Sequence, residues 1–358
     1  MIDLIINKIK ERSNTFYLGW KFISMIFRFR LPGIVCVFMI FLSYSTIAQK
    51  NDFIVASDGT GDYTSIQKAV DACKAFPDAR VTIFVKNGIY KEKVVVPACN
   101  TKLSIIGESV EKTIITFDDY FDKMNRGRNS TFYTYTLKIE ASDFRLENIT
   151  VENSAGAVGQ AVALHVEGDR CVFINCRFIG CQDTVYAAGR FSRQYFAKCY
   201  LEGTTDFIFG EATALFEDCT VHCKSDSYIT AASTPKGKPY GFVFLNCKIT
   251  VADGVKKVYL GRPWRSYAKV AYLYCKMGSF ISPEGWNNWS KSDNEKTAFF
   301  AEYHNTGNGA STNKRVEWSI NLSDAEAFGY TKEKIFAPVI WDVSVGKSWF
   351  GTDFKIKN

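Results

Sequence analysis

Signatures of common hydrolases are scarce in this chain of 358 residues. It has only three histidines, with no His-x-x-x-His pair, and it has no Gly-x-Ser-x-Gly segment. The first absence excludes the zinc peptidases that bind metal through two histidines on one helix, and the second argues against a serine hydrolase of the usual strand–turn–helix type. Linkers rich in Pro, Gly or Ser are also absent, so the sequence shows no boundary between folded domains.

Long apolar runs are missing as well. The run at residues 34–42, IVCVFMIFL, has nine residues, whereas a membrane-spanning helix needs roughly 20. Arg28 and Arg30 precede it, and Thr46-Ile47-Ala48 follows it. This order predicts a secretory signal peptide over residues 1–48, and a translation start at Met25 would give that signal a conventional length. We therefore expect an exported protein (periplasmic, cell-surface or secreted) with no membrane span after cleavage.

The charge of the chain is weak and dispersed. The net charge is +7, and residues 1–48 contribute six basic and two acidic side chains, which leaves +3 on residues 49–358. No block of Lys and Arg supports nucleic-acid binding, although a mildly basic protein is compatible with an acidic polymer. With 47% hydrophobic and 23% charged residues, the composition is that of a globular protein.

What the sequence does contain is a repeat. Five cysteines recur in one context, an alternating apolar segment such as FINCRFI or VFLNCKI, at spacings of 23, 20, 28 and 28 residues: Cys176, Cys199, Cys219, Cys247 and Cys275. Asn148 in RLENITV fits the same frame 28 residues before the first of them. Short strands repeating at this period predict a solenoid, and the scarcity of helical patterns between them favours a parallel β-helix. We expect one such domain over residues 51–358.

The repeated cysteines have two interpretations. Consecutive coils of a parallel β-helix lie about 4.8 Å apart, so the five side chains would form an internal column of small buried thiols. Disulfides between stacked strands are geometrically feasible alternatives. We favour free thiols, because a stacked column needs no cross-link.

Helical signals occur only near the two ends of the repeat. Thr64-Ser65-Ile66-Gln67 matches a capping box and opens a helix that places Ile66, Ala69, Val70 and Cys73 on one face. We expect this helix to cover the first coil. Ser323–Glu326 and Thr331–Glu333 predict two short helical turns after the last strands.

Polar residues follow the same repeat. Gln160, Asp183 and Asp206 are separated by 23 and 23 residues, so we expect them to stack as a column on one outer face. Arg262, which is 56 residues after Asp206, could pair with a carboxylate through both prongs of its guanidinium group, and Trp264 lies on the same face of an extended chain. The alternative is that these residues only form a polar column on a solvated face and have no catalytic function. Together, however, these residue types are typical of a carbohydrate-processing site.

Eight motifs carry a resemblance to a known family. They are GDYTSIQKAV (61–70), GIYKEKV (88–94), QAVAL (160–164), QDTVY (182–186), DFIFG (206–210), YLGRPW (259–264), EGWNNW (284–289) and EYHNTGNGA (302–310). In this order they resemble the pectin methylesterases over residues 52–345. The resemblance implies a right-handed parallel β-helix, in agreement with the repeat.

 The resemblance further implies a monomeric ester hydrolase that removes methyl groups from methyl-esterified galacturonate in pectin, releases methanol and needs no metal or cofactor.

The resemblance also implies roles for eight residues of this chain. They are Asp206 as nucleophile, Asp183 as general acid and base, Gln182 and Gln160 as donors to the oxyanion, Arg262 as the residue that orients the nucleophile, and Thr131, Trp264 and Tyr186 as substrate contacts. The nucleophile would form an acyl-enzyme intermediate. The two carboxylates must differ in protonation, so we expect Arg262 to lower the pKa of Asp206 and like charge to raise the pKa of Asp183.

One segment departs from part of the family, and two alternative functions stay open. Residues 117–129 (FDDYFDKMNRGRN) are longer than the matching segment of plant members and resemble bacterial ones. The alternatives are an esterase or thioesterase on the same scaffold with a non-pectin substrate, and a non-catalytic β-helix that binds polysaccharide. Pectate elimination would need a calcium-binding cluster of Asp residues, and the motifs contain none.

Overall fold

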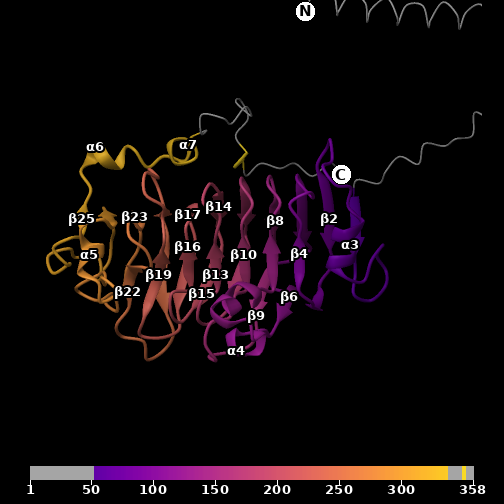
Figure 1. The fold of residues 1–358 in the computed structure, drawn as a ribbon, viewed down its shortest axis with the longest axis horizontal. Coiled ribbons are helices and arrows are strands. Elements are labelled where there is room, and N and C mark those ends of the chain that lie inside the picture. The colour runs from indigo at the N-terminus through magenta and orange to yellow at the C-terminus, as the bar shows by residue number, and fades with distance from the viewer. Residues whose placement is uncertain (1–51, 338–348, 352–358) are drawn as a thin grey trace, which may run out of the picture. The chain divides into compact units, whose positions relative to one another are not determined.

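The computed structural model describes residues 52–337 and 349–351, so the predicted signal peptide lies outside the described residues. Short parallel strands coil into a right-handed β-helix, which confirms the predicted fold class (Figure 1). Within the described residues, no helix is both long and apolar enough to cross a membrane.

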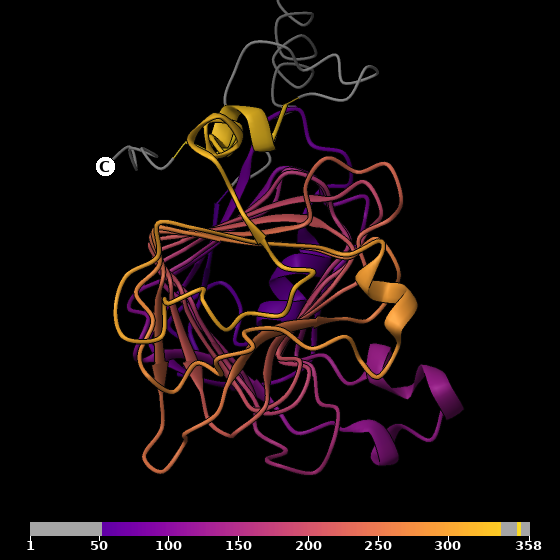
Figure 2. The ribbon, with the colours of Figure 1, turned by 90° about the vertical axis from the view of Figure 1, so that its left-hand side faces the viewer.

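Three parallel sheets, here called A, B and C, form the wall of the β-helix (Figure 2). Sheet A contains β1 (Asp52–Val55), β2 (Val81–Val85), β5 (Leu103–Gly107), β8 (Arg145–Glu147), β11 (Cys171–Ile174), β14 (Arg193–Ala197), β17 (Thr213–Glu217), β20 (Phe242–Leu245), β23 (Lys269–Leu273), β24 (Phe299–Tyr303) and β25 (Ile320–Asn321). Sheet B contains β3 (Gly88–Lys91), β6 (Thr113–Phe117), β9 (Thr150–Asn153), β12 (Arg177–Ile179), β15 (Tyr200–Gly203), β18 (Thr220–Cys223) and β21 (Lys248–Val251). Sheet C contains β4 (Val94–Val96), β7 (Leu137–Ile139), β10 (Leu164–Val166), β13 (Val185–Ala187), β16 (Ile208–Gly210), β19 (Tyr228–Ala232) and β22 (Tyr259–Pro263).

The cysteine repeat marks the corner between sheets A and B. In each repeat, the residue before the cysteine adopts the left-handed conformation, with φ between 50° and 57°: Asn175, Lys198, Asp218, Asn246 and Tyr274. Asn and Asp tolerate this conformation because their short polar side chains can hydrogen-bond locally. The corner explains why a polar residue so often precedes the cysteine in the sequence.

The five repeated cysteines form the expected column, which we call the thiol ladder. All five are buried and unbridged. All five thiols donate weak hydrogen bonds to carbonyls of the preceding coil, as Cys247 Sγ does to the Phe216 carbonyl at 3.2 Å and Cys219 Sγ does to the Phe196 carbonyl at 3.4 Å. The thiol ladder therefore places small side chains, whose thiols are hydrogen-bonded, at the corner between sheets A and B.

The thiol ladder predicts a chemical result. When the protein is denatured and alkylated without reductant, we expect all five cysteines of the ladder to carry the alkyl label, because burial shields them from oxidation and no bridge joins them. Peptide mass spectrometry checks this directly. Two disulfides within the set would contradict the free-thiol interpretation.

An aromatic stack runs beside the thiol ladder along the inner side of sheet A. Its rings lie 4.3–4.7 Å apart and nearly parallel, and each ring precedes a cysteine of the ladder by three residues: Phe173, Phe196, Phe216, Phe244 and Tyr272. Stacked aromatic pairs contribute roughly 0.5–1.5 kcal/mol each beyond their buried area. The stack thus fixes the register of the coils that carry the polar column on sheet C.

The predicted N-terminal helix is present as α3 (Ile66–Ala72), but its cap differs from the prediction. Ser65 is the N-cap residue, and the carboxylate of Glu92 accepts the backbone N–H groups of Ile66 and Gln67 at 2.8 and 3.1 Å. The Gln67 side chain binds the backbone of Val95 instead of closing a capping box. A residue 25 positions away therefore caps the helix, which lies across the far end of the β-helix in Figure 2.

The two C-terminal helical turns are present after the last strand, as predicted. Helix α6 (Asp324–Ala327) has a full capping box from Ser323, and α7 (Lys332–Ile335) starts after Thr331. However, Ile335 packs with the hydrophobic residues on the outer side of sheet A, so α7 runs along the wall rather than over the last coil. At that end, Trp318 packs against Phe300 of the core at 5.6 Å.

Two excursions from the coils of the β-helix were not predicted as helical. The first contains α4 (Phe121–Met124) and a 3₁₀ helix, η1 (Gly127–Tyr133), and the second contains α5 (Ser292–Glu295). These short helices have too few residues for a helical period to be visible in the sequence. The first excursion follows β6 and leads to β7, so it flanks the face of sheet C that carries the polar column.

Candidate active site

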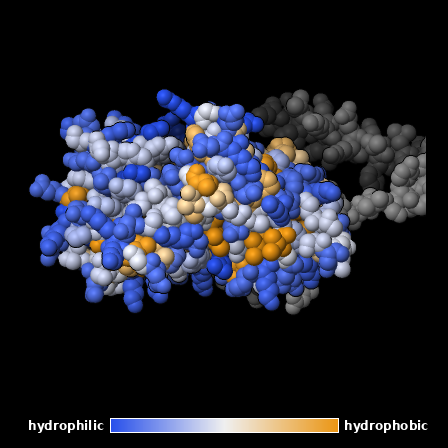
Figure 3. Space-filling view, turned by 90° about the horizontal axis from the view of Figure 1, so that it is seen from below, coloured by the Kyte–Doolittle hydropathy of each residue, from blue (hydrophilic) through white to orange (hydrophobic). Residues whose placement is uncertain are grey.

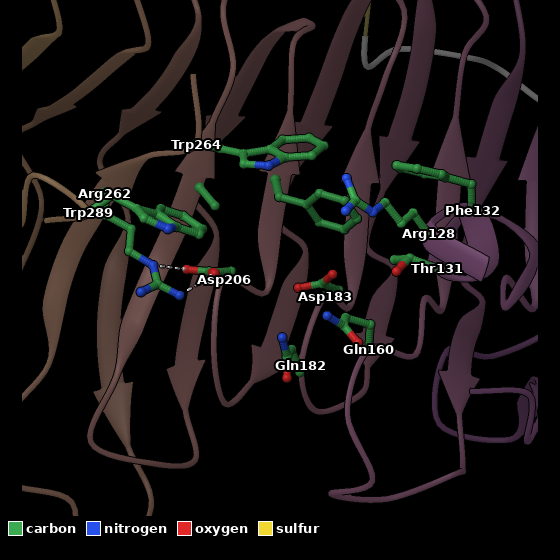
Figure 4. Close-up of a pocket in the computed structure, with 12 residues that line it drawn as sticks. Arg128, Thr131, Phe132, Gln160, Gln182, Asp183, Asp206, Arg262, Trp264 and Trp289 are labelled. Carbon is green, nitrogen blue, oxygen red and sulfur yellow. Dashed lines mark hydrogen bonds and ion pairs between the residues drawn. The ribbon is translucent and has the colours of Figure 1, made fainter. Parts of the chain in front are cut away.

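A cleft of about 220 Å³ opens on the outer face of sheet C (Figure 4). Its lining combines two carboxylates, two amides, two guanidinium groups and several aromatic rings: Arg128, Thr131, Phe132, Gln160, Gln182, Asp183, Asp206, Phe209, Ala231, Arg262, Trp264 and Trp289. Seven of the eight residues named from the sequence are in this set, so the structure brings them together from segments more than 100 residues apart.

Asp206 and Arg262 form a two-pronged ion pair. Arg262 Nε donates to Asp206 Oδ1 at 2.9 Å, and Arg262 Nη2 donates to Asp206 Oδ2 at 2.7 Å. The spacing of 56 residues covers two coils, as predicted, but the coils are unequal: Asp206 N–H donates to the carbonyl of Tyr228, and Tyr228 pairs with Tyr259. Arg262 therefore stands further along its strand than equal coils would place it, and its long side chain reaches back.

Aromatic rings hold the guanidinium group of Arg262 from both sides. Its Cζ atom lies 3.9 Å from the ring centre of Tyr228 and 3.7 Å from that of Trp289. Such contacts favour the planar, delocalised guanidinium group over a compact ammonium group. Sequence reasoning assigned no role to either ring, although Trp289 ends the EGWNNW motif.

Asp183 occupies the next coil and is chemically distinct from Asp206. Burial raises the pKa of Asp183 well above its ordinary value, and the negative charge of Asp206 raises it further, while Arg262 opposes both effects. Burial also raises the pKa of Asp206, against the lowering effect of Arg262. The expected fall in the pKa of Asp206 is therefore wrong in sign, because the side chain is buried. The expected order of the two pKa values remains: the pKa of Asp183 is raised more than that of Asp206, so Asp183 is the group that favours its protonated form.

Both aspartates share an unusual backbone. Their φ values are 65° for Asp183 and 51° for Asp206, in the left-handed region. Each stands two residues before a sheet C strand, where the chain turns its carboxylate outward over the cleft. Asp is among the few residues that accept this conformation. The two positions thus suit Asp and Asn but would strain most other side chains.

The two glutamines lie side by side, in a register that differs from the predicted column. Gln160 forms its β-bridge with Gln182 rather than with Asp183, whereas Asp183 N–H donates to the Thr205 carbonyl of the next coil. Within the described residues, neither side-chain amide has a hydrogen-bond partner, so both keep free N–H donors beside Asp183 (Figure 4). Paired amide donors are suited to an oxygen atom that gains negative charge.

Thr131 reaches the cleft from η1, which a buried amide anchors. Asn153 Nδ2 donates to the carbonyls of Asp119, Thr134 and Val162 at 2.8–3.1 Å. These three contacts tie both ends of the excursion to the segment that carries Gln160. The excursion is therefore a built part of the cleft.

Trp264 lines the cleft, as expected, but Tyr186 does not. The Tyr186 ring stacks on Phe209 at 4.6 Å and lies 5.1 Å from Phe132, so it supports two aromatic residues that do line the cleft. The sequence analysis missed Arg128 and Phe132. Those two lie in or beside the segment whose length differs among family members, so no motif pointed to them.

No set of three or more His, Cys, Asp and Glu side chains gathers as a candidate metal site in residues 52–337 and 349–351. The cleft instead offers a carboxylate fixed by Arg262, a second carboxylic group that favours its protonated form, and free amide donors. On a parallel β-helix, this combination defines a carboxylate-based hydrolase that acts on carbohydrate.

The comparisons identify the family. The Pectinesterase family model matches residues 52–337, and the chain belongs to that family. Pectinesterase 31 of Arabidopsis thaliana is 41% identical over 292 residues, which cover 79% of this chain and 92% of that protein. Pectinesterase 4 of the same plant is 34% identical, and the match covers 82% of this chain but only 52% of that protein.

Solved structures agree with this assignment. The pectin methylesterase from carrot superimposes with a TM-score of 0.75 at 32% identity, covering 80% of this chain and 92% of that structure. Pectin methylesterase PemA from Erwinia chrysanthemi gives a TM-score of 0.69 at 27% identity, covering 79% and 96%. The chain is therefore a carboxylic ester hydrolase with the architecture of both plant and bacterial enzymes.

Proposed function

We propose that this protein removes methyl groups from methyl-esterified galacturonate in pectin, with Asp206 as nucleophile. The observation that carries the proposal is the pairing of Asp206 with Arg262 beside Asp183, a carboxylic group whose pKa is raised well above the ordinary value. A polysaccharide-binding module would gain nothing from a buried carboxylate held for attack. A non-pectin esterase is a weaker alternative, because the cleft is walled by aromatic rings suited to sugar faces.

In the first step, an Asp206 oxygen attacks the C6 carbonyl carbon of the ester. Arg262 binds both oxygens of Asp206 but leaves each a free lone pair, so the carboxylate is oriented and still nucleophilic. The carbonyl oxygen gains charge and accepts N–H donors from Gln182 and Gln160. As the bond to the methoxy oxygen breaks, protonated Asp183 gives its proton to that oxygen, and methanol leaves.

In the second step, water resolves the acyl-enzyme anhydride. Asp183, now a carboxylate, takes a proton from water as the water oxygen attacks C6. The bond between C6 and Asp206 breaks, which restores the Asp206 carboxylate and frees galacturonate as an acid. The proton on Asp183 is the one that the next turnover needs, so the cycle closes without a cofactor.

The aromatic walls support a sugar polymer as substrate. Trp264 lies 5.9 Å from Phe209, roughly at right angles to it, and Trp289 stands at the same end of the cleft (Figure 4). A structure of a pectin methylesterase in complex with a hexasaccharide superimposes on this chain with a TM-score of 0.68 at 27% identity, covering 79% of the chain. By analogy we propose that several consecutive sugars occupy this cleft, with Thr131 and Trp264 among their contacts.

The primary test measures methanol release from highly esterified pectin by the purified protein. We expect release that depends on protein concentration, together with a matching gain of titratable acid. Binding of pectin without methanol release would favour the polysaccharide-binding module. Release from simple aryl or thioester substrates alone would favour the non-pectin esterase.

Arg262→Lys tests how the nucleophile is held. Lys cannot supply two parallel donors or fill the space between Tyr228 and Trp289, so Asp206 loses orientation and its pKa rises further. We expect kcat to fall about ten- to a hundredfold, for a lost contact of about 1.5–3 kcal/mol. Because Asp206 acts as the anion, the acid limb of the pH–rate profile should move to higher pH. An unchanged acid limb would show that Arg262 does not set the ionisation of Asp206.

Export, monomeric state and the bacterial character of the segment at residues 117–129 are further proposals. Residues 1–48 have the order of a signal peptide, and the substrate is an extracellular polymer. Figure 3 shows one face of the molecule, where hydrophobic residues form separate small areas among hydrophilic ones, as on proteins that do not associate through that face. N-terminal sequencing of exported protein and light scattering test the first two.

A further inference from the structure

Lys93 binds both ends of the first excursion, which contains α4 and η1, although it belongs to another coil. It immediately precedes β4, at the edge of sheet C, whereas the excursion lies between β6 and β7. Lys93 Nζ donates to Asp119 Oδ2 at 2.7 Å, where the excursion begins, and to the Tyr133 carbonyl at 2.7 Å, where η1 ends. One ammonium group therefore joins the two ends of a segment that projects from the wall of the β-helix (Figure 2).

The ion pair between Lys93 and Asp119 is shielded from solvent. The Asp119 side chain is 7% exposed and the Lys93 side chain is 26% exposed. Asp119 also pairs with Lys123 Nζ at 3.0 Å, and the Lys93 ammonium group lies 4.6 Å from the centre of the Tyr135 ring. Removing one partner of a buried ion pair is strongly destabilising, because the remaining charge lacks compensation. The contact therefore holds its place more firmly than an exposed ion pair would.

The same excursion holds the segment that supplies Gln160. Near its start, Phe121 N–H donates to the Gln160 carbonyl at 2.9 Å. Near its end, the Thr134 hydroxyl accepts from Val162 N–H at 2.9 Å and donates to the Thr131 carbonyl at 2.8 Å. Contacts from both ends of the excursion thus fix the backbone at Gln160 and at Thr131, and those are the two ends that Lys93 joins.

We propose that Lys93 is a positioning residue for the reaction: by joining the ends of the excursion, it keeps the Gln160 amide where the ester carbonyl oxygen gains charge. This inference rests on the proposed function, in which Gln160 donates to that oxygen. A donor stabilises the transition state only when it is held at hydrogen-bond distance from the developing charge. Lys93 is not among the described residues that line the cleft, so its effect on turnover passes through Gln160.

A double-mutant cycle of Lys93→Met with Gln160→Ala tests the proposal by activity. Met replaces the apolar stem of the lysine but cannot bind Asp119 or the Tyr133 carbonyl. We expect Lys93→Met to lower kcat about tenfold, less than the roughly 10²–10³-fold loss typical of removing an oxyanion donor. When Gln160 is already Ala, the same change should lower kcat less than about twofold, because the donor that Lys93 positions is gone. Equal factors in both backgrounds would overturn the proposal.

Lys91→Met is the matched control. Lys91 lies two positions before Lys93, but its Nζ atom is 4.0 Å from Asp118 and both of these side chains are exposed. The same chemical change there should leave kcat at the wild-type value. Lys93→Met combined with Asp119→Asn guards against misfolding, because no buried carboxylate is then left without its partner. This double variant should have the kcat of Lys93→Met, and a wild-type kcat would overturn the proposal.

Hydrogen exchange separates this inference from the proposed function, because it requires no turnover. Mass spectrometry follows the amide hydrogens of peptides that cover residues 119–134 and 160–163. We expect exchange in both peptides to become about tenfold faster in Lys93→Met and to stay at the wild-type rate in Lys91→Met. If the protein released no methanol but exchange still depended on Lys93, the proposed function would fail and the role of Lys93 in holding Gln160 would stand. Unchanged exchange in Lys93→Met would overturn that role.

Discussion

Replacing Asp206 by Asn should abolish methanol release. An amide is a poor nucleophile and cannot form the anhydride, so we expect turnover to fall by a factor on the order of 10⁴ or more, as for the loss of other catalytic nucleophiles. Asn accepts the left-handed backbone that Asp206 adopts at φ 51°, so folding should be preserved. The measurement is methanol release from esterified pectin, with circular dichroism to verify the fold.

Asp218→Asn is the matched control for this variant. Asp218 is also an aspartate in the left-handed conformation, at φ 54°, but it lies at the exposed corner between sheets A and B. The same chemical change there should leave methanol release at the wild-type rate. Retained turnover in Asp206→Asn would contradict the proposed mechanism, whereas equal losses in both variants would point to a general effect on the fold.

Replacing Asp183 by Asn should have the second largest effect on turnover. It removes the proton donor for methanol and the base for water, for which we expect a loss of about 10²–10⁴-fold. The basic limb of the pH–rate profile of the wild type reports the ionisation of Asp183, so this limb should disappear from any residual activity. Persistence of the same basic limb in Asp183→Asn would assign it to another group.

The same variant should be more stable than the wild type, in a pH-dependent manner. The pKa of Asp183 is raised in the folded state, chiefly by burial, above about 3.9 in the unfolded chain. Folding therefore favours the protonated form, and stability is lost as the pH rises from the unfolded pKa through the folded pKa. We expect Asp183→Asn and wild type to have similar melting temperatures near pH 4, with Asp183→Asn higher at pH 8.

The fold could be predicted from the sequence because the fold is built of repeated coils. One coil buries one small set of side chains, so the same Cys and Phe positions recur at the period of the coil, and their recurrence predicts a β-helix without any long-range knowledge. The differences in length between coils could not be predicted from the repeat. The bridge from Gln160 to Gln182 and the displaced position of Arg262 both follow from insertions that shift register between coils.

Features made by contacts between distant segments could not be predicted. The cap that Glu92 provides for α3 and the packing of α7 along sheet A join residues whose proximity only the assembled coils create. The same holds for the sandwich of Arg262 between Tyr228 and Trp289. Burial of Asp206 also reversed the expected sign of its pKa change, since the sequence shows its charged partner but not the solvent that it loses.

The corner between sheets A and B has a consequence for how such a molecule changes over time. From β11 to β21, every strand of sheet A is joined to the next strand of sheet B by two residues, a left-handed one and a cysteine of the ladder. Variation in coil length falls instead in the connections on either side of sheet C, where the cleft lies. The corner between sheets A and B keeps a constant length, whereas the connections on either side of sheet C can acquire insertions. Loops grafted beside sheet C should therefore alter what the cleft accepts while the coils beneath them keep their register.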